Sequence, residues 1–336
     1  MFDAQLLLLL IIAAALVFDF TNGAHDCANA IASVVSTRVL TPRVAVAMAA
    51  SLNLLGALLG EEVANTLGNG IVRLDIISDN QIMVLSALSA AITWNSITWY
   101  FGIPSSSSHA LIGGLMGSAI AQAGPEAVNG MTVVQKVLLP LLLSPLAGFC
   151  MGFALMSLIG QIFFRIHRAF VMRFFRRAQI FSSAFMALSH GFNDAQKTMG
   201  VISMALLIFG EIESFHIPLW VKLICALAMA SGTFMGGWKI VKTMGQKIFK
   251  LEPVHGFTAE LSSAAVIGCA SIIGAPISTT QTITACIFGV GSTRRLSAVR
   301  WGIAGNLVIA WLLTIPASAG VGAAGFLLLR LVWGQN

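Results

Sequence analysis

The sequence predicts an all-α integral membrane protein, and two observations carry this prediction. First, 57% of the 336 residues are hydrophobic and only 10% are charged, with a mean hydropathy of +0.88, whereas about a quarter of the residues of an ordinary soluble domain are charged. Second, the apolar runs approach or exceed the roughly 20 residues that a helix needs to cross a bilayer, and they are longer than the strands of a membrane barrel.

Ten apolar segments, five in each half of the chain, are expected to be helical. The first and the sixth each contain a polar patch, at which we expect a break in the helix. Short segments such as 104–122 and 276–291 suit full spans or re-entrant hairpins alike, so the sequence predicts about ten to twelve membrane segments. The ten segments lie near 4–36, 43–66, 82–101, 104–122, 132–164, 178–209, 218–238, 258–274, 276–291 and 301–332.

The charged residues divide the connections between the two sides of the membrane. Connections rich in Lys and Arg belong in the cytoplasm, which places fourteen of the nineteen basic residues there. They are Arg38, Arg43, Arg165, Arg168, Arg173, Arg176, Arg177, Lys239, Lys242, Lys247, Lys250, Arg294, Arg295 and Arg300. The opposite side receives Asp3, Asp75, Asp79, Glu126, Glu211 and Glu213. No basic patch with interleaved aromatic residues occurs in a soluble segment, which argues against nucleic-acid binding.

An odd number of crossings in each half makes the second half enter the membrane in the opposite sense. We therefore expect two inverted repeats, residues 1–164 and 178–336, joined by a short basic cytoplasmic connection at 165–177. Such a pair places equivalent elements of both halves at the middle of the membrane. The predicted architecture thus has broken helices or re-entrant elements at the midplane.

Two similar polar patches, at 20–26 and 188–194, interrupt long apolar stretches and end in Asp26 and Asp194. A carboxylate at bilayer depth is costly to desolvate, so it usually faces a protein-lined cavity and marks a path for an ion or a substrate. Interruptions at corresponding points of two halves indicate the binding site of a transporter.

A second duplicated element runs from Pro104 to His109 and from Pro276 to Gln281. We expect each to start a helix, with the proline at the first helical position and Ser or Thr as the cap. Two helix N-termini that face each other would form an anion site to which hydroxyl groups add hydrogen bonds, and phosphate suits it because phosphate both donates and accepts. A serine run alone would indicate only capping and close helix packing.

The patches also offer ligands for a coupling cation. Asn22, Asp26 and Asn29 share one helix face, and a break at Gly23 would free backbone carbonyls for a hard cation such as sodium. A carboxylate beside His25 or His190 would equally serve a proton relay, so both couplings stay open. Two further charges in apolar segments fit this scheme. Lys197 would neutralise the substrate or pair with Asp194, and Glu260 is either a helix-entry charge or a third coupling carboxylate.

At these residues the chain resembles the inorganic phosphate transporter (PiT) family, and most closely its bacterial low-affinity Pit branch. The matching stretches cover both halves and lie at 22–30, 94–95 with 99–102, 104–109 with 111–113, 189–197 and 276–281. The chain departs from the family at His25, where much of the family has Asn, and at Gln281, where His is common. The short connection at 165–177 replaces the long cytoplasmic insertion of many relatives.

The resemblance implies a multi-pass homodimer in the inner membrane of a bacterium, which imports inorganic phosphate by symport with protons or sodium and has neither a cofactor nor a structural metal. It assigns phosphate binding to Ser106, Ser107, Ser108, Ser278, Thr279, Thr280 and Gln281, and the residue types add Lys197 to this set. It assigns the coupling cation to Asn22, Asp26, Asn29, Asn193 and Asp194, and the residue types add Glu260, with His25, His109 and His190 as candidate proton-relay residues.

Three alternatives remain at this point. Some relatives move sulfate, so a symporter of sulfate or another tetrahedral oxyanion is one, and the Pit branch also takes phosphate as a metal complex. An intramembrane hydrolase would use one of the serines 105–108 with His109 or His190, but adjacent Ser108 and His109 point about 100° apart on a helix. A passive anion channel would not explain the buried acids. We therefore predict a transporter and not an enzyme.

Overall fold

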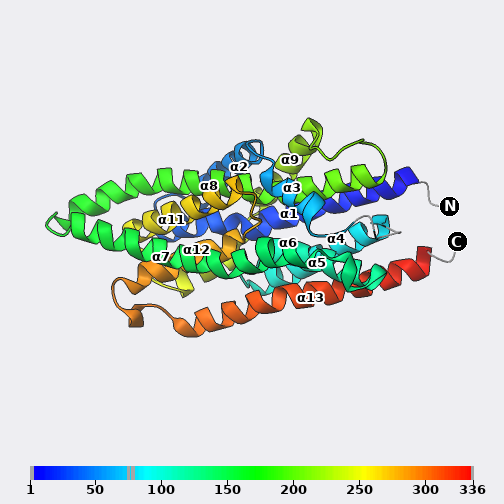
Figure 1. Cartoon of the computed structure of the whole chain (residues 1–336). Coiled ribbons are helices and arrows are strands. Elements are labelled where there is room, and N and C mark those ends of the chain that lie inside the picture. The colour runs from blue at the N-terminus through cyan, green and yellow to red at the C-terminus, as the bar shows by residue number, and fades with distance from the viewer. Residues whose placement is uncertain (1–3, 74–75, 77–79, 334–336) are drawn as a thin grey trace.

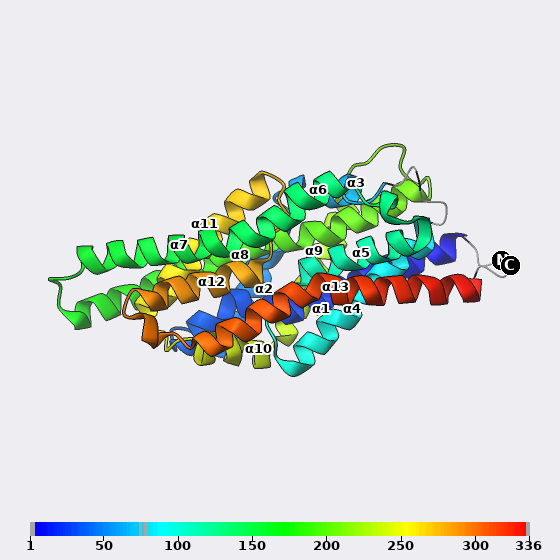
Figure 2. The ribbon, with the colours of Figure 1, turned by 60° about the horizontal axis from the view of Figure 1, so that its bottom comes forward.

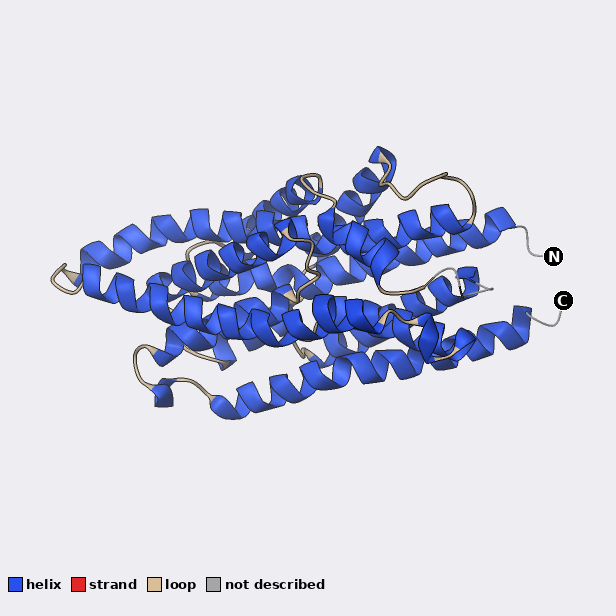
Figure 3. Cartoon of the chain, viewed as in Figure 1, coloured by secondary structure: helices blue, strands red, loops and turns tan. Residues whose placement is uncertain are grey.

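The computed structural model describes residues 4–73, 76 and 80–333, and helices joined by loops account for this part of the chain (Figures 1 and 3). No strand is formed among these residues; Val72 and Val128 make an isolated antiparallel bridge. The all-α prediction is therefore confirmed. The acidic residues Asp3, Asp75 and Asp79, which we assigned to the side opposite the cytoplasm, lie outside the described residues.

Two long helices form the centre of the molecule. They are α1 (Ala4–Ser36) and α8 (Arg168–Ile208), which pack against each other and run in opposite directions (Figures 1 and 2). α8 begins at Arg168, after a turn at 163–167, so most of the basic connection predicted at 165–177 is helical. The antiparallel pair gives the two halves the inverted relation that the odd number of crossings predicts.

Both helices continue through their polar patches, so the breaks predicted there are wrong. The glycines serve close packing instead. A Cβ atom on Gly23 would lie 2.2 Å from the carbonyl oxygen of Met229, and one on Gly191 would lie 2.2 Å from that of Asn53. Because only glycine lets two helix backbones approach so closely, each patch lies at a helix crossing, and its backbone carbonyls stay within the helix.

The bends occur at other, equivalent places in the two halves. α2 (Pro42–Ala57) meets α3 (Glu62–Gly70) at 70°, and α9 (Leu219–Met235) meets the segment of α10 (Trp238–Lys242) and η3 (Thr243–Lys247) at 62°. These bent helices carry the backbones that cross the patches, because α9 packs on α1 and α2 packs on α8. Each repeat thus contributes one bent helix to the other repeat.

Two short helices start near the middle of the molecule and run toward opposite ends (Figures 1 and 2). They are α5 (Ser107–Ala123), which follows α4 (Asn80–Phe101), and α12 (Thr279–Ser292), which follows α11 (Pro253–Ile272). Pro104 and Pro276 each precede the first helical residue by three positions, so their predicted place at the first helical position is wrong. The intervening residues are extended and end in a serine cap.

The outer helices complete each repeat. α6 (Gly130–Val133), η2 (Val134–Leu138) and α7 (Leu139–Ile162) close the first half, and α13 (Trp301–Trp333) closes the second. Single 3-10 turns, η1 (Pro125–Ala127) and η4 (Leu296–Ala298), lie in the connections that precede them.

Among the described residues, four helices are long and apolar enough to cross a membrane, and six if each bent pair is one span. The four are Gln5–Ser36, Gln81–Phe101, Gly130–Ile162 and Trp301–Val332. This number is smaller than ten to twelve because α5 and α12 are too short for a full crossing, and α8 and α11 contain too many polar residues. The short and bent helices are the re-entrant and broken elements that the sequence predicts at the midplane.

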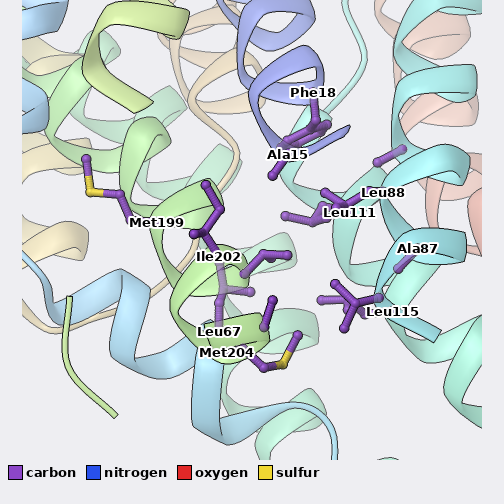
Figure 4. Close-up of a cluster of buried hydrophobic side chains, with 14 of the residues drawn as sticks. Ala15, Phe18, Leu67, Ala87, Leu88, Leu111, Leu115, Met199, Ile202 and Met204 are labelled. Atoms are coloured by element: carbon purple, nitrogen blue, oxygen red, sulfur yellow. The ribbon is translucent and has the colours of Figure 1, made fainter. Parts of the chain in front are cut away.

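Apolar side chains from both halves pack in a common core. Figure 4 shows part of it, to which Phe18 of α1, Leu111 of α5 and Met199 and Ile202 of α8 contribute. Basic connections gather at the end of the molecule opposite the two termini (Figures 1 and 2), where Arg176 donates to the carbonyl of Arg38 over 3.1 Å. The charge asymmetry therefore separates the two ends of the bundle.

Candidate functional site

The two short helices α5 and α12 begin at the centre of the molecule with the same cap. The Ser106 hydroxyl accepts a hydrogen bond of 3.2 Å from the amide of His109, and the Ser278 hydroxyl accepts one of 3.3 Å from the amide of Gln281. The same local structure results because both helices start with a small hydroxyl residue in extended conformation, which satisfies one free amide of the first turn. The remaining free amides and the positive end of each helix dipole face the interior.

Asp26 on α1 joins the two helix starts. Its carboxylate accepts a hydrogen bond of 2.9 Å from the hydroxyl of Ser107 and one of 3.0 Å from the hydroxyl of Thr280. The ring nitrogen Nδ1 of His25 lies 2.7 Å from the same carboxylate. Asp26 is only 2% exposed, so its charge is balanced by protein groups and not by bulk water.

Asp194 on α8 has the corresponding position in the second repeat, with a different set of partners. It accepts a hydrogen bond of 3.0 Å from Thr279 and forms an ion pair with Lys197, and Nε2 of His190 lies 3.1 Å from it. Lys197 is fully buried and also contacts the Ser108 hydroxyl and, over 3.3 Å, the Ile277 carbonyl. The ammonium group therefore lies at the start of both short helices.

The two acids approach each other. One oxygen each of Asp26 and Asp194 and a ring nitrogen of His190 lie within 4.8 Å of one another, and all three residues are buried. Two carboxylates and one ammonium leave one negative charge in this cluster when His25 and His190 are neutral. Because a buried net charge is unfavourable, the arrangement is suited to bind a cation, and the oxygen ligands fit a hard one.

Asn29 connects the helix starts to α1. Its amide nitrogen donates to the hydroxyls of Thr279 and Thr280 over 3.1 and 3.0 Å, while its carbonyl oxygen has no hydrogen-bond partner among the described residues. Ser108 donates to the carbonyl of Ile277 over 3.3 Å. These bonds hold the two repeats together at the site. The side-chain oxygen of Asn29 is therefore available to a ligand.

The remaining predicted residues occupy the margin of the cluster or lie apart from it. Gln281 and His109 contact each other at 3.5 Å, and Asn193 donates to Ser271 over 2.7 Å. Both polar atoms of the Asn22 side chain are buried without a partner among the described residues. Glu260 does not join the acid pair, because it accepts hydrogen bonds from Ser33, Ser182 and Gln179, and Ser33 lies seven residues beyond Asp26 on α1.

Sequence reasoning missed three groups of residues around the cluster. The side-chain oxygen of Asn53 of α2 is an acceptor 3.1 Å from Nδ1 of His190, and the side-chain nitrogen of Asn53 donates to the Thr233 hydroxyl over 3.0 Å. Thr98 and Ser105 lie 3.2 and 3.4 Å from Nε2 of His25. Asp19 is a fully buried carboxylate on α1. A signal was present for Asp19 and Asn53, since each is an isolated polar residue in an apolar run.

The cluster is closed in this conformation. Asp26, Asp194 and Lys197 and the hydroxyl residues at both helix starts are at most 2% exposed. A soluble ion can reach them only if helices move apart, as in alternating access, where one repeat moves against the other around a fixed site.

A known protein family also matches the two halves of the chain separately. A model of the family described as the phosphate transporter family matches twice, at residues 22–172 and 165–322. A probable low-affinity inorganic phosphate transporter of Bacillus subtilis (strain 168) is 46% identical over 98% of this chain and 98% of its own length. One of Rhizobium meliloti (strain 1021) is 47% identical over 97% of both chains.

A solved structure described as the sodium-dependent phosphate transporter is 27% identical and superimposes with a TM-score of 0.90, covering 97% of this chain and 99% of that one. These relatives are transporters and not enzymes, which confirms that prediction. With two family matches that span both halves and relatives that are identical at nearly half of their positions, this chain is a multi-pass membrane protein that belongs to the phosphate transporter family.

Proposed function

We propose that the protein imports inorganic phosphate across the cytoplasmic membrane of a bacterium by symport with a monovalent cation. The observation that carries this proposal is the meeting of Asp26 and Asp194 between the capped starts of α5 and α12. Helix starts attract an anion, and the acid pair attracts a cation, so the two ligands bind next to each other and each lowers the electrostatic cost of the other.

The chemistry of the helix starts supports phosphate as the anion. Ser107, Ser108, Thr279 and Thr280 present hydroxyls that now bond to Asp26, Asp194 or the Ile277 carbonyl. When the cluster opens, these hydroxyls and the free amides become donors to a tetrahedral oxyanion, and Lys197 supplies a positive charge. A protonated phosphate also donates hydrogen bonds, which the carboxylates can accept and which sulfate does not offer at neutral pH.

Charge balance sets the coupling. With His25 and His190 neutral, the cluster holds one excess negative charge, and a singly charged phosphate adds another. At least two monovalent cations, as protons or sodium ions, would neutralise the loaded site. Import therefore carries at least one net positive charge inward, and a negative interior membrane potential should accelerate it.

The direct test is uptake of radiolabelled phosphate into proteoliposomes under an inward proton gradient, an inward sodium gradient, or neither, each with and without a negative interior potential. We expect accumulation above equilibrium only with a gradient, and stimulation by the potential. Excess unlabelled sulfate should compete weakly. Equilibration without accumulation under every gradient would indicate a passive channel, and strong competition by sulfate would indicate a general oxyanion carrier.

The matched variants are Asp26→Asn and Gly160→Ala. Asp26→Asn keeps the size and removes the charge of the acid pair, so gradient-driven uptake should be lost. Gly160 lies on the exposed face of α7 with nothing within 4 Å of an added Cβ, so its variant should transport like the wild type. Equal uptake by Asp26→Asn and the wild type would reject the proposed site.

We also propose that the protein is a homodimer. In the most apolar stretches of the spans Gly130–Ile162 and Trp301–Val332, only 22% of the residues are buried within one chain. A second copy of the chain therefore has a broad apolar surface against which to pack. Crosslinking in native membranes and the mass of the detergent-solubilised complex test this, and a single-chain mass in both experiments would reject it.

A further inference from the structure

Asp19 is a carboxylate in the core that the cluster described above does not use. It lies on α1 with no exposed surface, and neither of its oxygens has a hydrogen-bond partner among the described residues. Its neighbour in sequence, Phe18, belongs to the apolar core cluster that also includes Met199 and Ile202 of α8 (Figure 4). An ionised carboxylate without a partner is strongly disfavoured in such surroundings.

Other unpartnered polar groups lie near Asp19. The buried hydroxyl of Thr198 of α8 lies close enough to interact with the Asp19 carboxylate, but the two groups do not reach hydrogen-bond geometry, and the hydroxyl has no other partner among the described residues. Asn22 follows three residues later on α1, on the same helix face, and both of its polar atoms are unpartnered as well. Three neighbouring polar side chains therefore leave their hydrogen-bonding capacity unused. Such a group is costly unless a ligand occupies it during the working cycle.

The position of Asp19 links it to the acid pair. Asp19, Asn22 and Asp26 are spaced by three and four residues, so they form a line along one face of α1, with the two carboxyl groups two turns, or about 10 Å, apart. The charged and titratable groups that act on Asp19 from other helices are Asp194 and Lys197 of α8 and Cys225 of α9. α1 begins at the end of the molecule where both termini lie (Figure 1), and Asp19 precedes Asp26 along this helix, so Asp19 is the nearer of the two to that end.

We propose that Asp19 is a proton-binding site through which the coupling proton passes between that end of the molecule and the acid pair. This inference rests on the proposed function and makes the proton its coupling cation. In the step, the Asp19 carboxylate takes up one proton to become a neutral carboxylic acid, which is the stable form in the closed core. It then releases the same proton by way of Asn22 and water to the cluster of Asp26 and Asp194, and returns to the carboxylate.

A proton suits the site better than sodium does. Sodium requires a shell of several oxygen ligands, whereas the neutral oxygen-bearing side chains identified beside Asp19 are those of Thr198 and Asn22. A single carboxyl group is sufficient to hold a proton. Asn22 also offers both a donor and an acceptor, which a relay needs and a sodium shell does not.

The test compares two activities of Asp19→Asn, which keeps the shape of a protonated carboxyl group but cannot release its proton. Exchange of internal for external radiolabelled phosphate needs no net proton movement, and we expect the variant to retain it. Accumulation driven by an inward pH gradient should be lost, together with the alkalinisation of the medium that accompanies phosphate entry. Asp19→Glu should recover part of the accumulation.

Ser203→Ala provides the control, because Ser203 is a buried hydroxyl on α8 without a partner among the described residues and lies outside both sites. It should retain exchange and accumulation. A second readout is independent of transport. Difference infrared spectra of the wild type should contain a carboxylic-acid carbonyl band that is absent from Asp19→Asn and retained in Ser203→Ala.

Several results would overturn the inference. Loss of exchange and accumulation together in Asp19→Asn would assign Asp19 to packing. Accumulation of phosphate by the wild type only under a sodium gradient, and its loss in Asp19→Asn, would assign the site to sodium. Unchanged proton-driven accumulation, or no infrared band that depends on Asp19, would remove it from the proton path. Absence of all phosphate exchange in the folded wild type would reject the proposed function, and the infrared comparison would still decide the protonation of Asp19.

Discussion

The two polar patches occupy equivalent places in the inverted repeats, but they differ in charge. Asp26 is held by the neutral donors Ser107 and Thr280 and by His25, whereas Asp194 forms an ion pair with Lys197. Lys197 takes the place that Asn29 has in the first patch, three residues beyond the acid in both. The backbone is thus duplicated and the electrostatics are not. Asp194 has an ammonium group as its permanent counter-ion, whereas Asp26 has no ammonium partner among the described residues.

The largest expected effect comes from removing the permanent counter-ion. Lys197→Met leaves Asp194 as an unpaired buried charge, which costs about 3–5 kcal/mol of stability. Thermal or denaturant unfolding of the purified protein measures this effect. The double variant Lys197→Met with Asp194→Asn should recover most of the loss, because both charges are then absent. Equal destabilisation in the single and the double variant would contradict the ion pair as the cause.

The hydroxyls that donate hydrogen bonds to Asp26 and Asp194 allow a second comparison of the two patches. Thr280→Val removes a hydrogen bond to Asp26, and Thr279→Val removes one to Asp194. A bond to a charged group contributes about 1.5–3 kcal/mol, and the larger loss is expected for Thr280→Val, because Asp26 has no ammonium partner. The same unfolding measurement, together with phosphate uptake, compares the two variants. A larger effect of Thr279→Val would reverse our assignment of the more dependent acid.

The helix crossings test the symmetric part of the comparison. An added methyl group would lie 2.2 Å from a backbone oxygen in Gly23→Ala and equally in Gly191→Ala. Overpacking of this kind costs about 1–3 kcal/mol, and we expect similar losses of stability from both variants. Gly160→Ala is again the control. A loss confined to one crossing would show that the two repeats are packed differently.

The smallest effect is expected at the basic end of the molecule. Arg168 and Glu252 form an ion pair of 3.0 Å in which the Arg168 side chain is 75% exposed. Exposed pairs contribute at most about 1 kcal/mol and are screened by salt. Arg168→Ala should therefore change stability by less than the core variants do and leave phosphate uptake intact. A loss of stability that persists at high salt would point to packing of the arginine stem instead.

Much of the site was predictable because it is repeated. The two acids and the two hydroxyl-rich helix starts stand out as polar residues in apolar runs, and the structure brings Asp26, Asp194, Thr279 and Thr280 together as the duplication indicates. Glu260 has the same sequence signal and yet lies apart, with Ser33, Ser182 and Gln179. A local pattern does not reveal which polar residues share a chamber, since that depends on the neighbouring helices.

The polar patches show that a local sequence pattern also fails to predict where a helix bends. Glycine beside polar residues indicated a broken helix at Gly23, and a break was also expected within the second patch. Both helices are continuous, because a second backbone approaches Gly23 from α9 and Gly191 from α2. The bends lie instead between α2 and α3 and between α9 and α10. A glycine that permits a bend and a glycine that permits close contact look alike in one sequence.

The sequence by itself determined the helical membrane fold, the two inverted halves and the residue types at the centre, because hydropathy and internal repetition are properties of the chain alone. Only the tertiary structure decided that Lys197 neutralises Asp194 and that Asp26 has no such partner. It also left Asp19, Asn22 and Thr198 without hydrogen bonds inside the apolar core. The physical reason is that the charge state and partners of a buried group depend on contacts between distant segments, and these exist only when the helices have packed.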